Sequence, residues 1–196
     1  MWIEITLATI ANMNRSWNHF KKLIATQDLP ELGPEPRADR LALVELNQIL
    51  DRFAAEGNLP AVFFPLVRSA TLLWHDYLDE SHALSQGIHN VDGSLVHGIM
   101  HRREPDYANA KYWFHRVGDH PCFREIARKA DELLTARGEK ELSLRLIPRG
   151  QWDPFAFIDA CEEVVEIPPL EPRRQTLQAI QEIEFDALLA HIYQLA

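Results

Sequence analysis

The chain has 196 residues, of which 46% are apolar and 25% are charged, and both fractions are ordinary for a folded globular protein. This composition excludes a chain that is disordered throughout, and the length suffices to bury a core without disulfides or structural metal ions. The net charge of −9 excludes a uniformly basic surface, so we expect no nucleic acid partner.

The cysteines and the apolar stretches favour a cytoplasmic protein. Cys122 and Cys161 are far apart and form no CxxC pair, so we expect two free thiols. The longest apolar stretch, residues 59–67, is too short and too rich in proline to cross a bilayer, and we expect no membrane partner. The N-terminus lacks the basic start of a secretory signal.

Hydrophobic periodicity predicts a series of helices separated by prolines and glycines. The predicted helices span residues 1–27, 39–56, 61–88 (as one helix or two), 95–103, 107–117, 122–137, 154–166 and 173–195. Between them, residues 28–39 form a proline-rich loop, and residues 139–153 are either extended or a short helix.

Polar residues and glycines predict several helix ends. Asp106 should cap the helix over 107–117, and Gly118 should end it. Gly138 should end the helix over 122–137. Asp153 precedes Pro154, which suits the first turn of a helix. Either Asp92 or Ser94 should cap the helix over 95–103.

These elements predict an all-α fold. We expect a single compact domain of about seven helices with no significant sheet. Residues 1–38 should form an N-terminal helix and the proline-rich loop, and residues 39–196 the helical core.

Seven of the nine histidines lie between His75 and His120. One predicted helix face carries four polar residues at spacings of three and four: His75, Asp79, His82 and Gln86. His97 and His101 are four residues apart and should stack on one face of the next helix, where Gly98 leaves room for a close neighbour. We expect His82, His97 and His101 to point into one shared space with acidic oxygens nearby.

Two histidines at this spacing can ligate one divalent metal ion. In that interpretation His97 and His101 are ligands, and Asp79, Glu80 or His82 from the facing helix completes the site. Such a site would suit a metal-dependent hydrolase, with a water molecule at the open position. The alternative is a buried, hydrogen-bonded polar seam with a structural role.

A basic and aromatic segment follows the histidine pair. Arginines beside aromatic rings can hold an anionic or planar small molecule. The residues that we expect to line such a ligand pocket are His82, His97, His101, Arg102, Arg103, Asp106, Tyr112, Trp113 and Arg116.

The segments "LDESH", "HGIMHRREPDYANAKYWFHRVGDHP" and "QWDPFAFIDACE" resemble a family of bacterial proteins with a D-E-S-H element, an H-[GA]-I-M-H-R-R-E-x-D core and a Y-W-[FW]-R-R-V-G-x-H-P tail. Leu95 and His115 depart from this pattern, where an aromatic residue and an arginine are expected. The positions of Asp106, Ala110, Trp113 and Phe114 also resemble one helix of the Sel1-like repeats. These resemblances imply a helical fold and a location for the site, without implying an activity.

Three classes of function therefore stay open. The first is a helical domain that binds a small anionic or planar ligand. The second is a metal-dependent hydrolase. The third is a protein interaction scaffold that uses the N-terminal segment and the loop over residues 28–39. The sequence leaves the oligomeric state open.

Overall fold

The computed structural model describes residues 18–56, 59–168 and 170–195. These residues form ten α-helices, and no strand lies among them. The first helix includes residues 18–23. The others are α2 (Leu43–Ala55), α3 (Phe64–Trp74), α4 (Leu78–Ser85), α5 (Val91–Arg103), α6 (Tyr107–Val117), α7 (Phe123–Arg137), α8 (Lys140–Leu146), α9 (Pro154–Val164) and α10 (Pro172–Leu195), with short 3₁₀ helices at Ala61–Phe63 and Pro148–Gly150. The predicted all-α fold is confirmed, with ten helices where about seven were expected.

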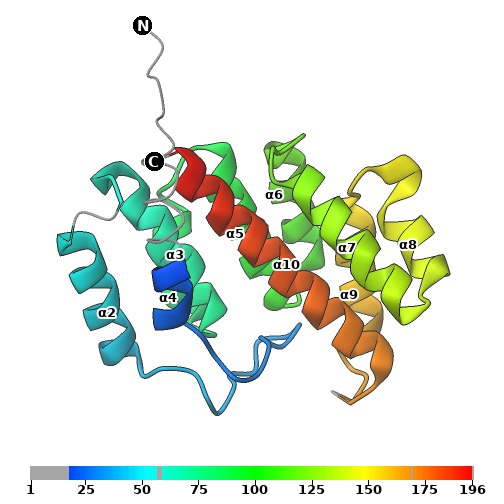
Figure 1. The fold of residues 1–196 in the computed structure, drawn as a ribbon, viewed down its shortest axis with the longest axis horizontal. Helices are drawn as coiled ribbons and strands as arrows, with labels where there is room; N and C mark the ends of the chain where they lie inside the picture. The colour runs from blue at the N-terminus through cyan, green and yellow to red at the C-terminus, as the bar shows by residue number, and fades with distance from the viewer. Residues whose placement is uncertain (1–17, 57–58, 169, 196) are drawn as a thin grey trace, which may run out of the picture.

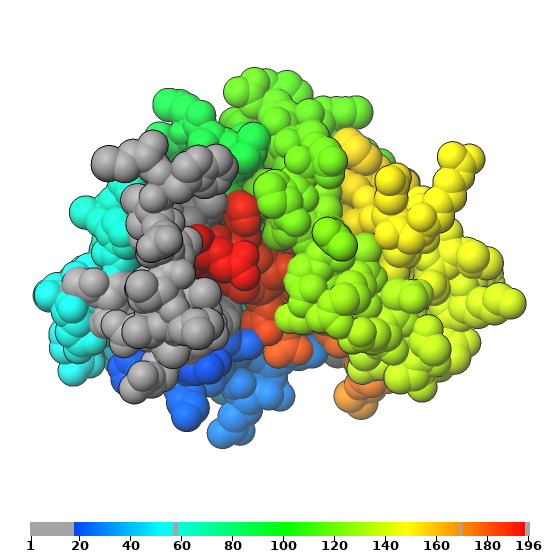
Figure 2. Space-filling model, turned by 45° about the horizontal axis from the view of Figure 1, so that its top comes forward, coloured from blue at the N-terminus to red at the C-terminus, as the bar shows by residue number. Residues whose placement is uncertain are grey.

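The 24-residue helix α10 runs across the middle of the molecule (Figure 1). In that view α2, α3 and α4 lie on one side of it and α7, α8 and α9 on the other. It contacts α3, α7 and α9, and its buried residues belong to one core shared with those helices. Its C-terminal end reaches the surface beside α7 (Figure 2).

The N-terminal segment packs on this same core. Phe20, Ile24 and Leu32 are buried within it. The described part of residues 1–38 is therefore attached to the helical core by apolar burial. The remainder of the helix predicted over residues 1–27 lies outside the described residues.

Several helix ends lie where local sequence signals predicted them. The Asp106 carboxylate accepts a hydrogen bond from the Asn109 backbone at the start of α6, and the Asp153 carboxylate does the same for Phe155 and Ala156 at the start of α9. Gly138 ends α7 in the left-handed conformation that glycine favours. Residues 140–146, left undecided by the sequence, form the short helix α8.

The helix predicted over residues 61–88 is two helices, broken at Asp76. This residue has a φ of 62°, and its buried carboxylate accepts hydrogen bonds from Arg37 (2.9 Å) and Arg103 (2.7 Å). The break separates His75 from α4. The prediction that His75 shares one helix face with His82 is therefore wrong.

Helix α5 is buried on nearly every side, from Asp92 to Arg103. Its cap is Asn90, whose side chain accepts the backbone N–H of Gly93, so the caps predicted at Asp92 or Ser94 are wrong. At Gly98 an added Cβ would lie 2.8 Å from the Phe114 ring, because α5 and α6 approach closely there. Without a side chain at position 98, α6 lies close enough to α5 for Trp113 to contact His97.

No helix within the described ranges is long and apolar enough to span a bilayer.

Candidate functional site

Three histidine rings from two helices meet in one place. His82 of α4 lies with its ring centroid 4.8 Å from that of His97 and 5.2 Å from that of His101, both on α5. The His97 and His101 centroids are 4.8 Å apart. One ligand atom from each ring lies within 4.8 Å of the other two. The structure thus brings together the three imidazoles that the spacing predicted would share one space.

Helix α6 covers the other side of this histidine cluster (His82, His97 and His101). The Trp113 ring stacks on His97 with centroids 4.0 Å apart. Nδ1 of His101 lies 3.1 Å from a Glu104 carboxylate oxygen, and the Asn109 side-chain nitrogen lies 3.1 Å from Nε2 of the same ring. A carboxylate on the far nitrogen of an imidazole is the usual outer partner of a metal-ligating histidine.

Burial favours the neutral forms of His97 and His101. It lowers the pKa of His97 to about 4, helped by the charges of His101 and His82 and opposed by a backbone contact with Ser85. Burial also lowers the pKa of His101, against the opposing charge of Glu104. A neutral imidazole offers a lone pair to a metal ion. Nδ1 of His97 is buried and has no hydrogen-bond partner.

The predicted acidic ligands are not part of this cluster. Asp79 is exposed and Glu80 half-buried on α4, and neither belongs to the group of residues placed to hold one ion. The carboxylate beside the histidines is that of Glu104, three residues after His101. The third ring comes from His82.

The predicted cluster of arginines does not form. The Arg102 and Arg103 side chains are fully buried and point to different partners. Arg102 donates to both carboxylate oxygens of Glu184 on α10, at 3.1 and 2.5 Å. Arg103 donates to Asp76 and to the Leu73 carbonyl. Both guanidinium groups hold the fold together, so the expectation that they grip an external ligand is wrong.

The other predicted ligand residues lie on α6. Asp106 caps the helix. Tyr112 is exposed, and its ring is nearly perpendicular to that of Trp113. Arg116 is also exposed and lies over Trp113. Trp113 and Arg116 are thus near the histidine cluster, and Asp106 has a structural role at the helix start.

A second group of polar residues was not predicted as a site. Asp92 of α5, His120 and His191 of α10 also place one ligand atom each within 4.8 Å of one another. His120 Nε2 lies 3.0 Å from Asp92, and its Nδ1 accepts the Cys122 backbone N–H at 3.2 Å. Nδ1 therefore carries a lone pair and Nε2–H donates to Asp92. Both nitrogens of His120 have partners, as those of His101 do, but no buried side-chain atom of this second group lacks a partner as Nδ1 of His97 does. We therefore interpret the second group as a structural network.

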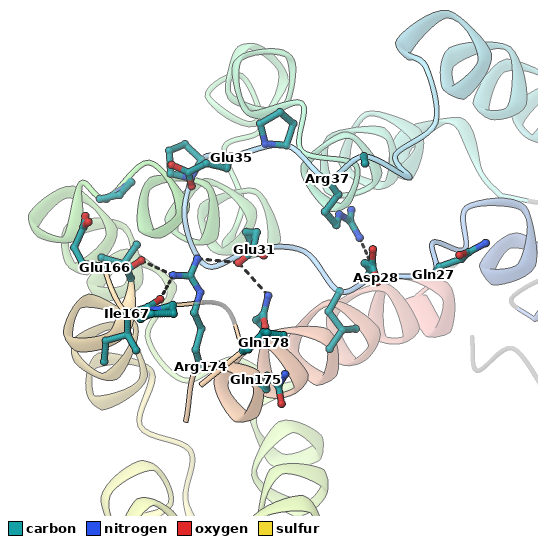
Figure 3. A pocket seen from close by; sticks show the side chains of 18 of the residues that line it. Gln27, Asp28, Glu31, Glu35, Arg37, Glu166, Ile167, Arg174, Gln175 and Gln178 are labelled. Atoms are coloured by element: carbon teal, nitrogen blue, oxygen red, sulfur yellow. Dashed lines mark hydrogen bonds and ion pairs between the residues drawn. The ribbon is translucent and has the colours of Figure 1, made fainter. Parts of the chain in front are cut away.

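A large cavity lies away from both histidine groups. It has a volume of about 1080 Å³ and opens between the proline-rich loop and the start of α10 (Figure 3). Arg174, which lines it, donates to the Val165 and Ile167 carbonyls and to Glu31. The ion pair of Arg174 and Glu31 thus holds the loop against α10.

No protein-family model, no curated protein and no solved structure matches this chain, so the site stands on its geometry alone.

Proposed function

We propose that the protein binds one divalent transition metal ion, with zinc the best fit, through His82, His97 and His101, and acts as a metal-dependent hydrolase. The observation that carries this proposal is the convergence of three ligand atoms within 4.8 Å of one another. Zinc binds imidazole nitrogens at about 2.0–2.1 Å in a tetrahedral arrangement, so small ring rotations would complete the site.

The properties of the rings favour a metal site over a structural seam. Buried polar atoms in a structural network normally have hydrogen-bond partners, as both nitrogens of His120 do. His97 instead has a buried nitrogen without a partner. Its pKa of about 4 keeps it neutral at pH 7, so no proton has to leave before an ion binds.

Three protein ligands leave a fourth position open, as in catalytic zinc sites. An ion held there would lower the pKa of a water molecule at that position to about 7, which supplies a nucleophile for hydrolysis. The chain's own contribution is to orient the rings. Glu104 would fix the His101 ring through Nδ1, and Trp113 would fix His97 by stacking. The Asn109 side chain, 3.1 Å from Nε2 of His101, would have to move off that nitrogen when an ion binds.

Metal content tests the proposal. Protein purified without a histidine tag, stripped with a chelator and reloaded with zinc should retain about one ion per chain after gel filtration. His101→Asn and His97→Gln should each reduce that content severely, because two imidazoles alone hold zinc weakly. The matched control is His191→Gln, which changes the structural network and should leave the metal content unchanged.

Two results would contradict the proposal. One is the absence of bound zinc in folded wild-type protein, with folding verified by circular dichroism. The other is a metal content that falls in His191→Gln and persists in His97→Gln.

The proposal includes a cytoplasmic location and no nucleic acid partner. Two buried free thiols, Cys122 and Cys161, support the first. The net charge of −9 supports the second.

A further inference from the structure

A small hollow lies one helical turn from the histidine cluster. It has a volume of about 320 Å³ and is lined by His89, Asn90, Val91, Ser94 and Arg116. Ser94 precedes His97 by three residues on α5, so the two lie on the same side of that helix. The hollow and the cluster are therefore neighbours along α5.

Arg116 connects the hollow to the cluster from α6. Its guanidinium carbon lies 5.4 Å from the centre of the Trp113 ring, and that ring stacks on His97 at 4.0 Å. The Trp113 ring thus lies between the Arg116 guanidinium and His97, one of the proposed metal ligands.

The charge of Arg116 has no acidic partner within the described part of the chain. It is exposed, and its contacts there are with the rings of Tyr112 and Trp113. Arg102 and Arg103, by contrast, are paired with buried carboxylates. A guanidinium supported on an aromatic ring keeps its donors directed outward.

We propose that this hollow binds an oxyanion group of the substrate, a phosphate or a carboxylate, with Arg116 as the main contact. This inference rests on the proposed function, since it names the substrate class of that same site. The planar fork of arginine matches such groups with two parallel hydrogen bonds. His89 is exposed and lines the same hollow, and its ring N–H offers a second hydrogen-bond donor beside Arg116. A substrate anchored there would lie one helical turn of α5 from the histidine cluster.

Calorimetric titration with inorganic phosphate and, separately, with acetate tests the inference. Each titration is done on the zinc-loaded and on the metal-free protein, because phosphate can also bind zinc directly. Arg116→Ala should weaken binding of the preferred anion at least about tenfold in both forms, the loss expected for a charge-assisted hydrogen bond. Arg124→Ala is the matched control. Arg124 is an exposed arginine on α7 that lines none of the cavities described above, and its removal should leave the affinity unchanged.

The inference is overturned if the metal-free protein binds neither anion, or if Arg116→Ala binds the anion as tightly as wild type. The zinc content of Arg116→Ala separates this failure from failure of the proposed function. About one ion per chain without anion binding leaves the metal site intact and removes the oxyanion subsite. Arginine-dependent anion binding without any bound zinc removes the hydrolase and leaves an anion-binding hollow.

Discussion

Arg102 and Arg103 are adjacent in the chain and fully buried, yet they are held by different parts of the fold. Arg102 pairs with Glu184 and lies over the Phe157 ring at 4.5 Å, which joins α5 to α10 and α9. Arg103 pairs with Asp76 at the break between α3 and α4. The sequence could show only that two cations follow a histidine. Their burial depends on acidic partners that are distant in the chain.

Removing Arg102 from its buried ion pair with Glu184 should destabilise the fold strongly. Arg102→Met leaves the Glu184 carboxylate buried without a counter-charge, and we expect a loss of about 3–5 kcal/mol in the free energy of unfolding by urea. Arg145→Ala, which breaks an exposed two-bond contact with Glu163, should change the urea midpoint little. Equal effects of the two substitutions would contradict this account of Arg102.

His75 is a buried histidine with a structural role. Its Nε2 lies 3.1 Å from the Ile24 carbonyl and its Nδ1 accepts the Leu41 N–H at 3.4 Å. Burial, helped by the charge of Arg37, lowers its pKa to about 4. Below its unfolded pKa of about 6.5, the unfolded chain therefore binds a proton that the folded chain does not.

Acidification should accordingly destabilise the protein. Stability due to neutral His75 is complete above pH 6.5 and falls as the pH approaches 4, with a loss of about 2 kcal/mol between pH 7 and pH 5. His75→Gln, which keeps a donor and an acceptor, should show a smaller fall in urea midpoint over that interval. The same slope in the variant and in wild type would show that His75 does not titrate as described.

Among the elements, α5 and α6 form the contact on which the site depends. Gly98 allows their close approach, and this brings Trp113 onto His97. Gly98→Ala places a methyl group 2.8 Å from the Phe114 ring, and we expect it to destabilise the fold by about 1–3 kcal/mol. Gly87→Ala is the control, because its added Cβ would meet only an ordinary contact at 3.5 Å. Equal melting temperatures for the two alanine variants would contradict this role of Gly98.

Element boundaries could be predicted where the signal is local. Asp106, Gly138 and Asp153 act on backbone groups within a few residues, so the sequence contains both partners. The break at Asp76 could not be predicted, because Arg37 and Arg103 stabilise it from distant positions. The proximity of His97 and His101 could be predicted for the same reason, because both residues lie within about one turn of a single helix.

At the scale of the whole molecule, tertiary packing decides which histidines meet. From the sequence, His82, Asp79 and Glu80 were equally good candidates for the third ligand beside His97 and His101. The network of Asp92, His120 and His191 was missed because its members come from three distant segments. Residue spacing within one helix gives no information about contacts between such segments.

Anomalous diffraction at the zinc edge, from crystals of the zinc-loaded protein, tests the central claim most directly. The account predicts one strong peak about 2.0–2.1 Å from a nitrogen of each of His82, His97 and His101. A peak between Asp92, His120 and His191 instead, or no peak among the three imidazoles, would contradict it.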